Sequence, residues 1–317
     1  MKADTKEGGH GPDRHRSGFV AIVGAPNAGK STLLNFLLDE KVAIVSRKPQ
    51  TTRHRILGIL TGKEAQMVFW DTPGYHSNAK ALNQEMVSRT LSALHDSDVC
   101  LWLVDGKRMG QEHLETRGLV AGLPKGKGLL IAINKADVMA PDELRSLKGA
   151  LSGAFPGTRV LAISARTGKG VGLLKKGITR LLPRGPALYP GDALTDQPMR
   201  LIASEFVREA VFECTREELP YSTAVTVDEY LEPVPSEGGG LPGKTYISVT
   251  IHVEKENQKA IMIGKGGARL QAIGTMARRN IERLLGGPVF LKIFVRISKD
   301  WTKNRKTIRE FGYGDIA

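Results

Sequence analysis

The chain alternates short apolar runs with segments of helical periodicity between residues 18 and 183. "FVAIVGA" is a continuous apolar run that ends in glycine, and "KSTLLNFLLDE" follows as a segment with apolar residues at helical spacing. Four further apolar runs each end in polar residues: "EAQMVFWDTPG", "DVCLWLVDG", "GLLIAINKAD" and "TRVLAISA". Strands separated by helices are typical of a mostly parallel sheet with helices on both faces, and such α/β sheets bind ligands beyond the carboxyl ends of their strands. We therefore expect the polar residues at these ends to form one site.

The pattern changes after residue 198. "MRLIASEFVREAVFECTREEL" predicts an amphipathic helix, and "YSTAVTVDEYLE", "TYISVTIHVE" and "PVFLKIFVRISKDW" predict three strands. "NQKAIMI" and "ARLQAIGTMARRNIERLL" predict a short and a longer helix between the second and third strands. The expected order is helix, strand, strand, helix, helix, strand, which defines an α+β domain. We therefore divide the chain into a disordered tail (1–16), an α/β domain (17–183), a Pro- and Gly-rich linker (184–198) and an α+β domain with a C-terminal tail (199–317).

Composition favours a cytoplasmic protein. The 317 residues are enough for two domains of ordinary size, and no run reaches the ~18 apolar residues of a membrane span. The N-terminal residues have no apolar core, so they do not predict a secretory signal. The two cysteines, Cys100 and Cys214, have no metal-binding spacing, which favours two core residues in a reduced compartment.

Charge is distributed unevenly along a chain whose net charge is +13. From Lys259 to Arg309 there are six Lys and seven Arg against only Glu282 and Asp300. From Glu205 to Glu237 the balance is reversed. A surface that only keeps a protein in solution mixes its charges, so the basic C-terminal segment suggests a polyanionic partner.

"GAPNAGKS" matches the G-x-x-x-x-G-K-[ST] phosphate loop and stands in the required place, between a predicted strand and a predicted helix. Backbone N–H groups of such a loop hold phosphates, and Lys30 would reach the β- and γ-phosphates. The Ser31 hydroxyl would ligate Mg²⁺. The predicted nucleotide-binding residues here are Gly24, Ala25, Pro26, Asn27, Ala28, Gly29, Lys30, Ser31 and Thr32.

"DTPG" follows at the end of another predicted strand. Asp71 would hold Mg²⁺ through water, and the Gly74 N–H would bind a γ-phosphate, because a residue without a side chain permits close approach. Thr72 and Pro73 complete the predicted motif.

"NKAD" predicts which base is bound. Guanine has two N–H donors that one carboxylate, Asp137, can accept, whereas adenine would leave that carboxylate unpaired. Asn134 would tie this loop to the phosphate loop, and the stem of Lys135 would cover the base. "SAR", residues Ser164, Ala165 and Arg166, would place backbone near the guanine O6. Four motifs in this order, each at a strand end, indicate a P-loop GTPase domain.

A switch segment is expected between these motifs. "SRKPQTTRHRILGI", residues 46–59, is basic and contains proline, as a mobile loop would. Either Thr51 or Thr52 would ligate Mg²⁺ in the GTP state and release it after hydrolysis. Ras-like enzymes place a water-orienting Gln just after the "DxxG" motif, but Tyr75 stands here, so we expect slow intrinsic hydrolysis.

"GKGG" is a second glycine-rich turn, between two predicted helices rather than after a strand. A G-x-x-G turn between helices is typical of a KH domain, here of type II, in which the loop clamps about four nucleotides of single-stranded RNA. Lys292 and Arg296 would add to the positive field. The predicted RNA-binding residues are Ile263, Gly264, Lys265, Gly266, Gly267, Arg269, Arg278, Arg279 and Arg283.

From Ser17 to Trp301 the chain resembles the Era family of bacterial GTPases, and "GAPNAGKS", "QTTRHRILGI", "DTPG", "NKAD" and "IMIGKGGARL" carry the resemblance. It implies a monomeric, Mg²⁺-dependent GTPase that binds GTP and GDP. It also implies that the KH domain holds the 3′ end of 16S rRNA during 30S subunit maturation, with RNA-stimulated hydrolysis and peripheral contact with the inner membrane. In GTPases that resemble this chain, an Asn at the place of Asn27 helps bind K⁺, whose charge replaces an arginine finger.

Three alternatives remain open from the sequence. GTP could be only a structural ligand of an RNA-binding assembly protein, and the basic segment could meet acidic lipids in a membrane-associated signalling GTPase. The "GKGG" turn argues against the lipid alternative, since lipid binding needs charge but not that loop. An ATP-dependent kinase is disfavoured by "NKAD".

Overall fold

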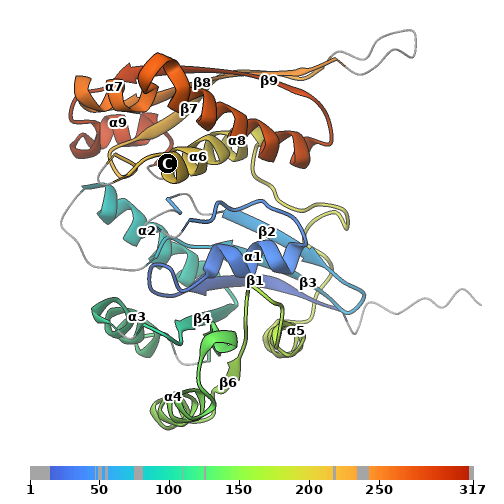
Figure 1. The fold of residues 1–317 in the computed structure, drawn as a ribbon. Coiled ribbons are helices and arrows are strands. Elements are labelled where there is room, and N and C mark those ends of the chain that lie inside the picture. Colours follow the sequence, from blue (N-terminus) through green and yellow to red (C-terminus); the bar gives the residue numbers. More distant parts are fainter. Residues whose placement is uncertain are drawn as a thin grey trace, which may run out of the picture.

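The computed structural model of the protein (Figure 1) describes residues 15–46, 48, 52–53, 56–74, 81–108, 110–124, 126–216, 219–233 and 243–313. Most of the expected N-terminal tail, Thr51 and Tyr75 lie outside the described residues.

The first domain is built on a six-stranded sheet with the order β2-β3-β1-β4-β5-β6. The strands are β1 (Arg16–Val23), β2 (Ile56–Thr61), β3 (Ala65–Asp71), β4 (Val99–Asp105), β5 (Gly128–Asn134) and β6 (Arg159–Ala162). All neighbours pair in parallel except β2, which runs antiparallel to β3. The prediction of a mostly parallel sheet is confirmed.

Strand β2 corrects one prediction, because residues 56–59 were expected to belong to a mobile loop. Ile56, Leu57 and Ile59 are buried, so this short apolar run pairs with β3 instead. Gly58 permits the strand to lie against α1 (Lys30–Leu38), since a Cβ there would come within 2.6 Å of Leu34.

Helices cover both faces of this sheet, as its two buried clusters require (Figure 1). One face packs against α1 and α5 (Val171–Leu181). The other packs against α2 (Ala81–Asp96), α3 (Gln111–Ala121) and α4 (Pro141–Ala154). Both faces of the strands are therefore apolar, and polar side chains are confined to the strand ends.

The second domain has the predicted order of elements. Its helices are α6 (Met199–Cys214), α7 (Glu256–Ile263) and α8 (Ala268–Leu285), and its strands are β7 (Ala224–Leu231), β8 (Thr245–Val253) and β9 (Val289–Ile297). The sheet order is β7-β8-β9, with β7 antiparallel and β9 parallel to β8. In this domain the three helices share one apolar core with the inner face of the sheet.

Helix α6 was predicted to be amphipathic, but it is buried on all sides over most of its length. Every residue from Ile202 to Phe212 is buried, because the helix lies between its own sheet and the first domain (Figure 1). Glu205 and Arg208 of this helix form a buried ion pair with an N–O distance of 2.5 Å. On the first-domain side, Glu209 of α6 accepts a bond from Lys41 at 2.6 Å.

Residues 184–198, the predicted linker, form no helix or strand, but they are fixed along the edge of the first sheet. The Ile59 N–H donates to the Leu194 carbonyl at 2.8 Å, and the Thr195 hydroxyl donates to the Leu57 carbonyl at 2.5 Å. The Gln66 amide donates to the Tyr189 carbonyl at 2.9 Å. Hydrogen bonds therefore attach this segment to β2 and β3.

The chain then continues past the predicted third strand of the second domain into η3 (Trp301–Lys303) and α9 (Arg305–Glu310), which the sequence analysis missed. Trp301, Ile308 and Tyr313 form a buried cluster with Met86 of α2, so this segment joins the two domains. Across the described ranges, no helix has the length and apolar character needed to cross a membrane.

Candidate functional site

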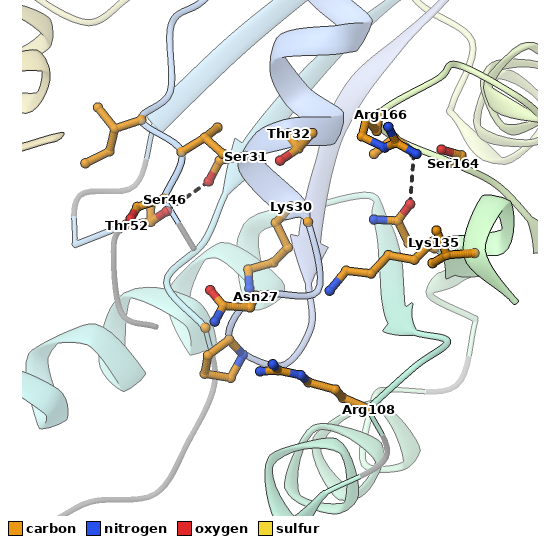
Figure 2. A pocket seen from close by; sticks show the side chains of 18 of the residues that line it. Asn27, Lys30, Ser31, Thr32, Ser46, Thr52, Arg108, Lys135, Ser164 and Arg166 are labelled. Carbon is orange, nitrogen blue, oxygen red and sulfur yellow. Dashed lines mark hydrogen bonds between the residues drawn. The ribbon is translucent and has the colours of Figure 1, made fainter. Parts of the chain in front are cut away.

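A pocket opens at the carboxyl ends of β1, β4 and β5, where the sequence predicted a site (Figure 2). Fourteen of the predicted residues line it: Pro26, Asn27, Gly29, Lys30, Ser31, Thr32, Thr52, Gly74, Asn134, Lys135, Asp137, Ser164, Ala165 and Arg166. The predicted residues Gly24, Ala25, Ala28, Asp71, Thr72 and Pro73 do not line it. The Thr72 hydroxyl, for example, donates to the buried Ile22 carbonyl at 2.7 Å.

The phosphate loop leads directly into α1. Gly29 has φ 96°, a conformation that favours glycine, and a Cβ there would come within 2.3 Å of the Asn134 amide. The Lys30 ammonium donates to the Gly24 and Ala25 carbonyls, each at 3.0 Å. Burial lowers the pKa of Lys30 to about 8, although Asp71 acts in the opposite direction. A bound phosphate would therefore stabilise a cation that burial disfavours.

Three oxygen-bearing side chains converge at the start of α1. The Ser31 hydroxyl donates to Asp71 Oδ2 at 2.5 Å and lies 2.9 Å from the Thr52 hydroxyl. Burial raises the pKa of Asp71 to about 6, which the Ser31 hydrogen bond opposes. Asp71 Oδ1 is buried and has no hydrogen-bond partner among the described residues. This oxygen set with an unsatisfied carboxylate oxygen fits Mg²⁺, which prefers oxygen ligands and retains several waters.

The loop after β3 approaches the phosphate loop very closely. A Cβ on Gly74 would lie 2.8 Å from the Pro26 Cα. This glycine is therefore required by the packing of the two loops as well as by the expected approach of a γ-phosphate.

The base-binding loops are held together by Asn134. Its amide donates to the Ala28 carbonyl at 2.7 Å, which is the tie to the phosphate loop expected from the sequence. Its carbonyl oxygen accepts the Ala165 N–H at 2.8 Å. The Asp137 carboxylate pairs with Arg166 at 2.6 Å, and this hydrogen bond lowers the pKa of Asp137. Arg166 therefore favours the charged form of a carboxylate that lines the pocket.

Lys135 enters the same space from the opposite side to Lys30 (Figure 2). Its ammonium is anchored on Asp105, at the end of β4, at 2.6 Å. This anchor extends the side-chain stem along the pocket, where it can cover a flat base.

The second glycine-rich loop connects α7 to α8 through the short helix η2 (Lys265–Gly267). Gly264, Gly266 and Gly267 have φ values of 74°, 58° and 81°, all in the region that favours glycine. A Cβ on Gly264 would lie 2.9 Å from the Arg269 Cβ. The Lys265 side chain is exposed at the tip of the turn.

A groove runs from this loop between α8 and the edge strand β9. Gly267, Leu270, Arg278, Leu291 and Ile293 are among the residues that line it. Arg278 is the one predicted arginine in the groove, and it lies 3.8 Å from Glu282. Arg279 and Arg283 are exposed on α8 outside the groove, and Ile263 is half-buried before the loop. Arg269 donates to the Ile261 carbonyl, which stabilises the turn.

Comparisons with known proteins agree with this architecture. Residues 19–135 match the family model described as 50S ribosome-binding GTPase, and residues 218–302 match the KH domain. GTPase Era of Geobacter metallireducens is 46% identical over 299 residues, covering 94% of this chain and 98% of the relative. The chain belongs to the Era family. GTPase Era of Syntrophus aciditrophicus is 42% identical and covers 98% of the chain and 100% of the relative.

Two solved Era structures also resemble this one over 95% of the chain, at 38% identity and with complete coverage of the solved chains. A variant of Aquifex aeolicus Era bound to GDP·AlF₄⁻ superposes with a TM-score of 0.87. Era in complex with MgGDPNP and nucleotides 1506–1542 of 16S ribosomal RNA superposes with a TM-score of 0.88. The GTPase fold and the KH fold predicted from the sequence are therefore both confirmed.

The fold of this Era-family chain brings further residues to the nucleotide pocket that sequence reasoning missed. Arg108 follows β4 and extends toward the phosphate loop (Figure 2). Its place just beyond a strand end was the available signal. Val45 directly precedes the predicted switch, Ser46 is its first residue, and Glu213 belongs to α6 of the KH domain. No local pattern could have placed Glu213 there, because the contact depends on how the two domains pack.

Proposed function

We propose that this Era-family protein is a GTP-hydrolysing switch that binds the 3′ end of 16S rRNA through its KH domain and assists 30S subunit maturation. One observation carries the proposal: two adjacent residues of the switch segment contact different domains, one at the nucleotide pocket and the other in the KH domain. The Thr52 hydroxyl contacts Ser31 at the start of α1, while the Arg53 guanidinium is buried against carbonyls of the KH domain.

Nucleotide binding would use the groups that converge at the pocket. The phosphate loop and Lys30 would hold the β- and γ-phosphates. Ser31 and Thr52 would ligate Mg²⁺ directly, and Asp71 would hold it through water. The ion would neutralise charge that develops on the phosphates. Gly74 would bind the γ-phosphate with its N–H, beside Pro26.

Guanine would be selected by Asp137, whose carboxylate accepts the two N–H donors of that base. The carboxylate is already paired with Arg166 at 2.6 Å, and two oxygens allow it to keep this partner while accepting from the base. Lys135 would cover the ring, and the backbone of Ser164 to Arg166 would meet the guanine O6.

Hydrolysis would be slow in the absence of RNA, since the position after the DxxG motif carries Tyr75 instead of a water-orienting Gln. Asn27 belongs to the phosphate loop and lines the pocket. From the resemblance to K⁺-dependent relatives, Asn27 would help bind K⁺ at the phosphates.

The KH domain would clamp RNA at the Gly264–Gly267 loop, where three glycines leave backbone open to phosphates. Lys265 adds a positive charge at the tip, and the groove between α8 and β9 would receive the bases. Arg278 in the groove would meet the RNA directly, while Arg279 and Arg283 would act through the surrounding field.

Contacts of the switch segment, and of the residues just before it, with α6 support communication between the two sites. The Val45 N–H donates to the Glu209 carboxylate at 2.8 Å, and Lys41 pairs with the same carboxylate at 2.6 Å. The Lys48 ammonium donates to the Thr215 carbonyl at 2.5 Å. Movement of the segment between nucleotide states would therefore pull on the helix that supports the KH sheet.

The experiment that tests this function measures GTP hydrolysis with and without a single-stranded RNA that copies the 3′ end of 16S rRNA. We expect the RNA to raise the hydrolysis rate of the wild-type protein. Lys265→Asp/Gly266→Asp should abolish this stimulation and leave the basal rate unchanged, since the loop is remote from the nucleotide. Lys176→Asp on the exposed face of α5 is the matched charge control. An ATP-driven rate, or stimulation that survives the loop variant, would contradict the proposal.

For localisation we propose the cytoplasm, where the 30S subunit matures, with peripheral contact at the inner membrane as the resemblance implies. We also propose a monomer. Sedimentation of the full chain tests both statements. A monomer predicts the sedimentation coefficient of one chain in the absence of vesicles, and membrane contact predicts that the chain sediments together with anionic vesicles.

A further inference from the structure

The sheet of the KH domain has one face that the helices leave uncovered. Along β9, alternate residues from Val289 to Ile297 pack into the helical core, whereas Phe290, Lys292, Phe294 and Arg296 face outward. Phe290 is 54% exposed and Phe294 is 46% exposed. Two exposed aromatic rings on one strand are unusual unless a partner covers them.

Part of this outer face is already occupied by the chain itself. Phe311, just after α9, packs on His252 of β8 with ring centroids 4.1 Å apart. The C-terminal segment therefore covers the His252 end of β8, whereas Phe290 and Phe294 remain exposed among the described residues. We call the part of the face around these two rings the bare half. The face can evidently receive flat rings.

The bare half combines aromatic rings with positive charge. Tyr246 of β8 lies directly opposite Phe290, with ring centroids 5.7 Å apart and ring planes only 11° apart. The Lys292 ammonium lies 4.9 Å from the centre of the Phe294 ring. Strand β9 carries no acidic residue. Aromatic rings interleaved with cations form the kind of surface that stacks bases and holds phosphates of single-stranded nucleic acid.

The bare half is also continuous with the RNA groove. A hollow in the outer face is lined by Tyr246, Lys292, Phe294 and Arg296, and Lys259 of α7 reaches into it. Helix α7 leads directly into the Gly264–Gly267 loop. The groove uses Leu291 and Ile293 on the opposite side of the same edge strand. A strand of RNA that leaves the groove can therefore pass over the edge of β9.

We propose that the outer face of β8 and β9 is a second RNA subsite, on which bases beyond those held by the glycine loop stack on Phe290 and Phe294. This inference rests on the proposed function and extends it. The loop and groove of a KH domain hold about four nucleotides, whereas the solved Era complex contains nucleotides 1506–1542. Asp228 and Glu229 lie on β7, across the hollow, so they would confine the phosphates to the β9 side.

The test compares two RNAs, one of about four nucleotides that fills only the groove, and a 12-nucleotide RNA that extends it. Each is titrated against the wild-type chain, Phe290→Ala/Phe294→Ala, and Leu173→Ala. Leu173 is the control because it is a large apolar side chain exposed on α5 of the first domain, away from the proposed path. Thermal unfolding of each variant verifies folding.

We expect the double variant to lose about tenfold or more in affinity per ring for the long RNA, the range found for base stacking on aromatic side chains. Its affinity for the short RNA should equal that of the wild type. Lys292→Gln should reduce the slope of log K against log salt by about 0.7 for the long RNA, the value for one phosphate contact with a single strand.

Equal affinities of wild type and double variant for the long RNA would overturn this inference while leaving the groove intact. An equal loss for both RNAs would also overturn it, since the rings would then act only through the fold. If the wild-type chain bound neither RNA, the proposed function itself would fail.

Discussion

Arg53 provides the sharpest test of how the two domains communicate. Its guanidinium is 2% exposed and donates to the carbonyls of Thr223 and Tyr221, both at 2.7 Å, and of Pro220 at 3.3 Å. It also lies 5.8 Å from the centre of the Trp301 ring. The residue before it, Thr52, contacts Ser31 in the nucleotide site. Arg53→Ala therefore cuts the link and leaves the site residues in place.

The magnitude follows from opposing contributions. Two short hydrogen bonds from a charged donor contribute about 3–6 kcal/mol together. Burial opposes them, since it lowers the pKa of Arg53 to about 10, which corresponds to about 3 kcal/mol against the charged form. The difference is about 0–3 kcal/mol, so we expect the variant to lose at most about 3 kcal/mol of domain coupling, the upper end of usual allosteric coupling energies.

The assay measures RNA affinity with a non-hydrolysable GTP analogue and with GDP, and takes the ratio of the two. We expect this ratio to fall toward one in Arg53→Ala, while GDP affinity stays near the wild-type value. Arg200→Ala is the matched control, because Arg200 donates only within the KH domain, to the Val227 and Asp228 carbonyls. A ratio in Arg53→Ala equal to that of the wild type would refute the reasoning.

Three further predictions concern single groups. Arg108→Ala should lower kcat for GTP at least about tenfold, because a cation near the phosphates stabilises developing charge. Lys107→Ala is the control and should leave kcat unchanged, because the Lys107 side chain pairs with Glu143. Stopped-flow phosphate release measures both rates, and equal rates for the two variants would exclude a role of Arg108 in hydrolysis. Asp137→Asn should weaken GTP binding at least about tenfold in competition titrations, since one guanine donor loses its acceptor, and unchanged affinity would contradict the assigned role. Burial, followed by the charge of Arg296, lowers the pKa of His252 from 6.5 to about 4, so the fold favours neutral His252. The contribution of neutral His252 to the free energy of unfolding is complete above pH 6.5. It is lost as pH falls toward 4, by at most about 1.4 kcal/mol per pH unit. In a plot of the free energy of unfolding against pH, His252→Gln should flatten this region, and the exposed control His95→Gln should leave it unchanged.

Short contiguous motifs were predictable because each one specifies a local backbone. The phosphate loop needs Gly29 at positive φ and a helix starting at Lys30, and both are readable within eight residues. The glycine turn before α8 is equally local. Likewise, the apolar runs that end in polar residues indicated where the strand ends and hence the pocket would lie.

Features that depend on long-range packing could not be predicted. The run at Ile56–Ile59 is too short and too close to basic residues to be distinguished from a loop until β3 pairs with it. Helix α6 was predicted to be amphipathic, because a sequence does not show that the opposite charges of Glu205 and Arg208, three residues apart, meet each other in the interior instead of water. Helix α9 has only six residues, and its stability depends on the burial of Ile308 in the cluster that contains Met86 of α2.

The central claim is that GTP in the first domain controls RNA affinity in the second. The most direct measurement is the dissociation constant of an RNA copying the 3′ end of 16S rRNA, taken with a non-hydrolysable GTP analogue, with GDP and without nucleotide. The account predicts the tightest binding with the analogue, and loss of binding in Lys265→Asp/Gly266→Asp. Equal dissociation constants in all three nucleotide states would contradict it. The two domains, joined by residues 184–198, would then bind their ligands independently of each other.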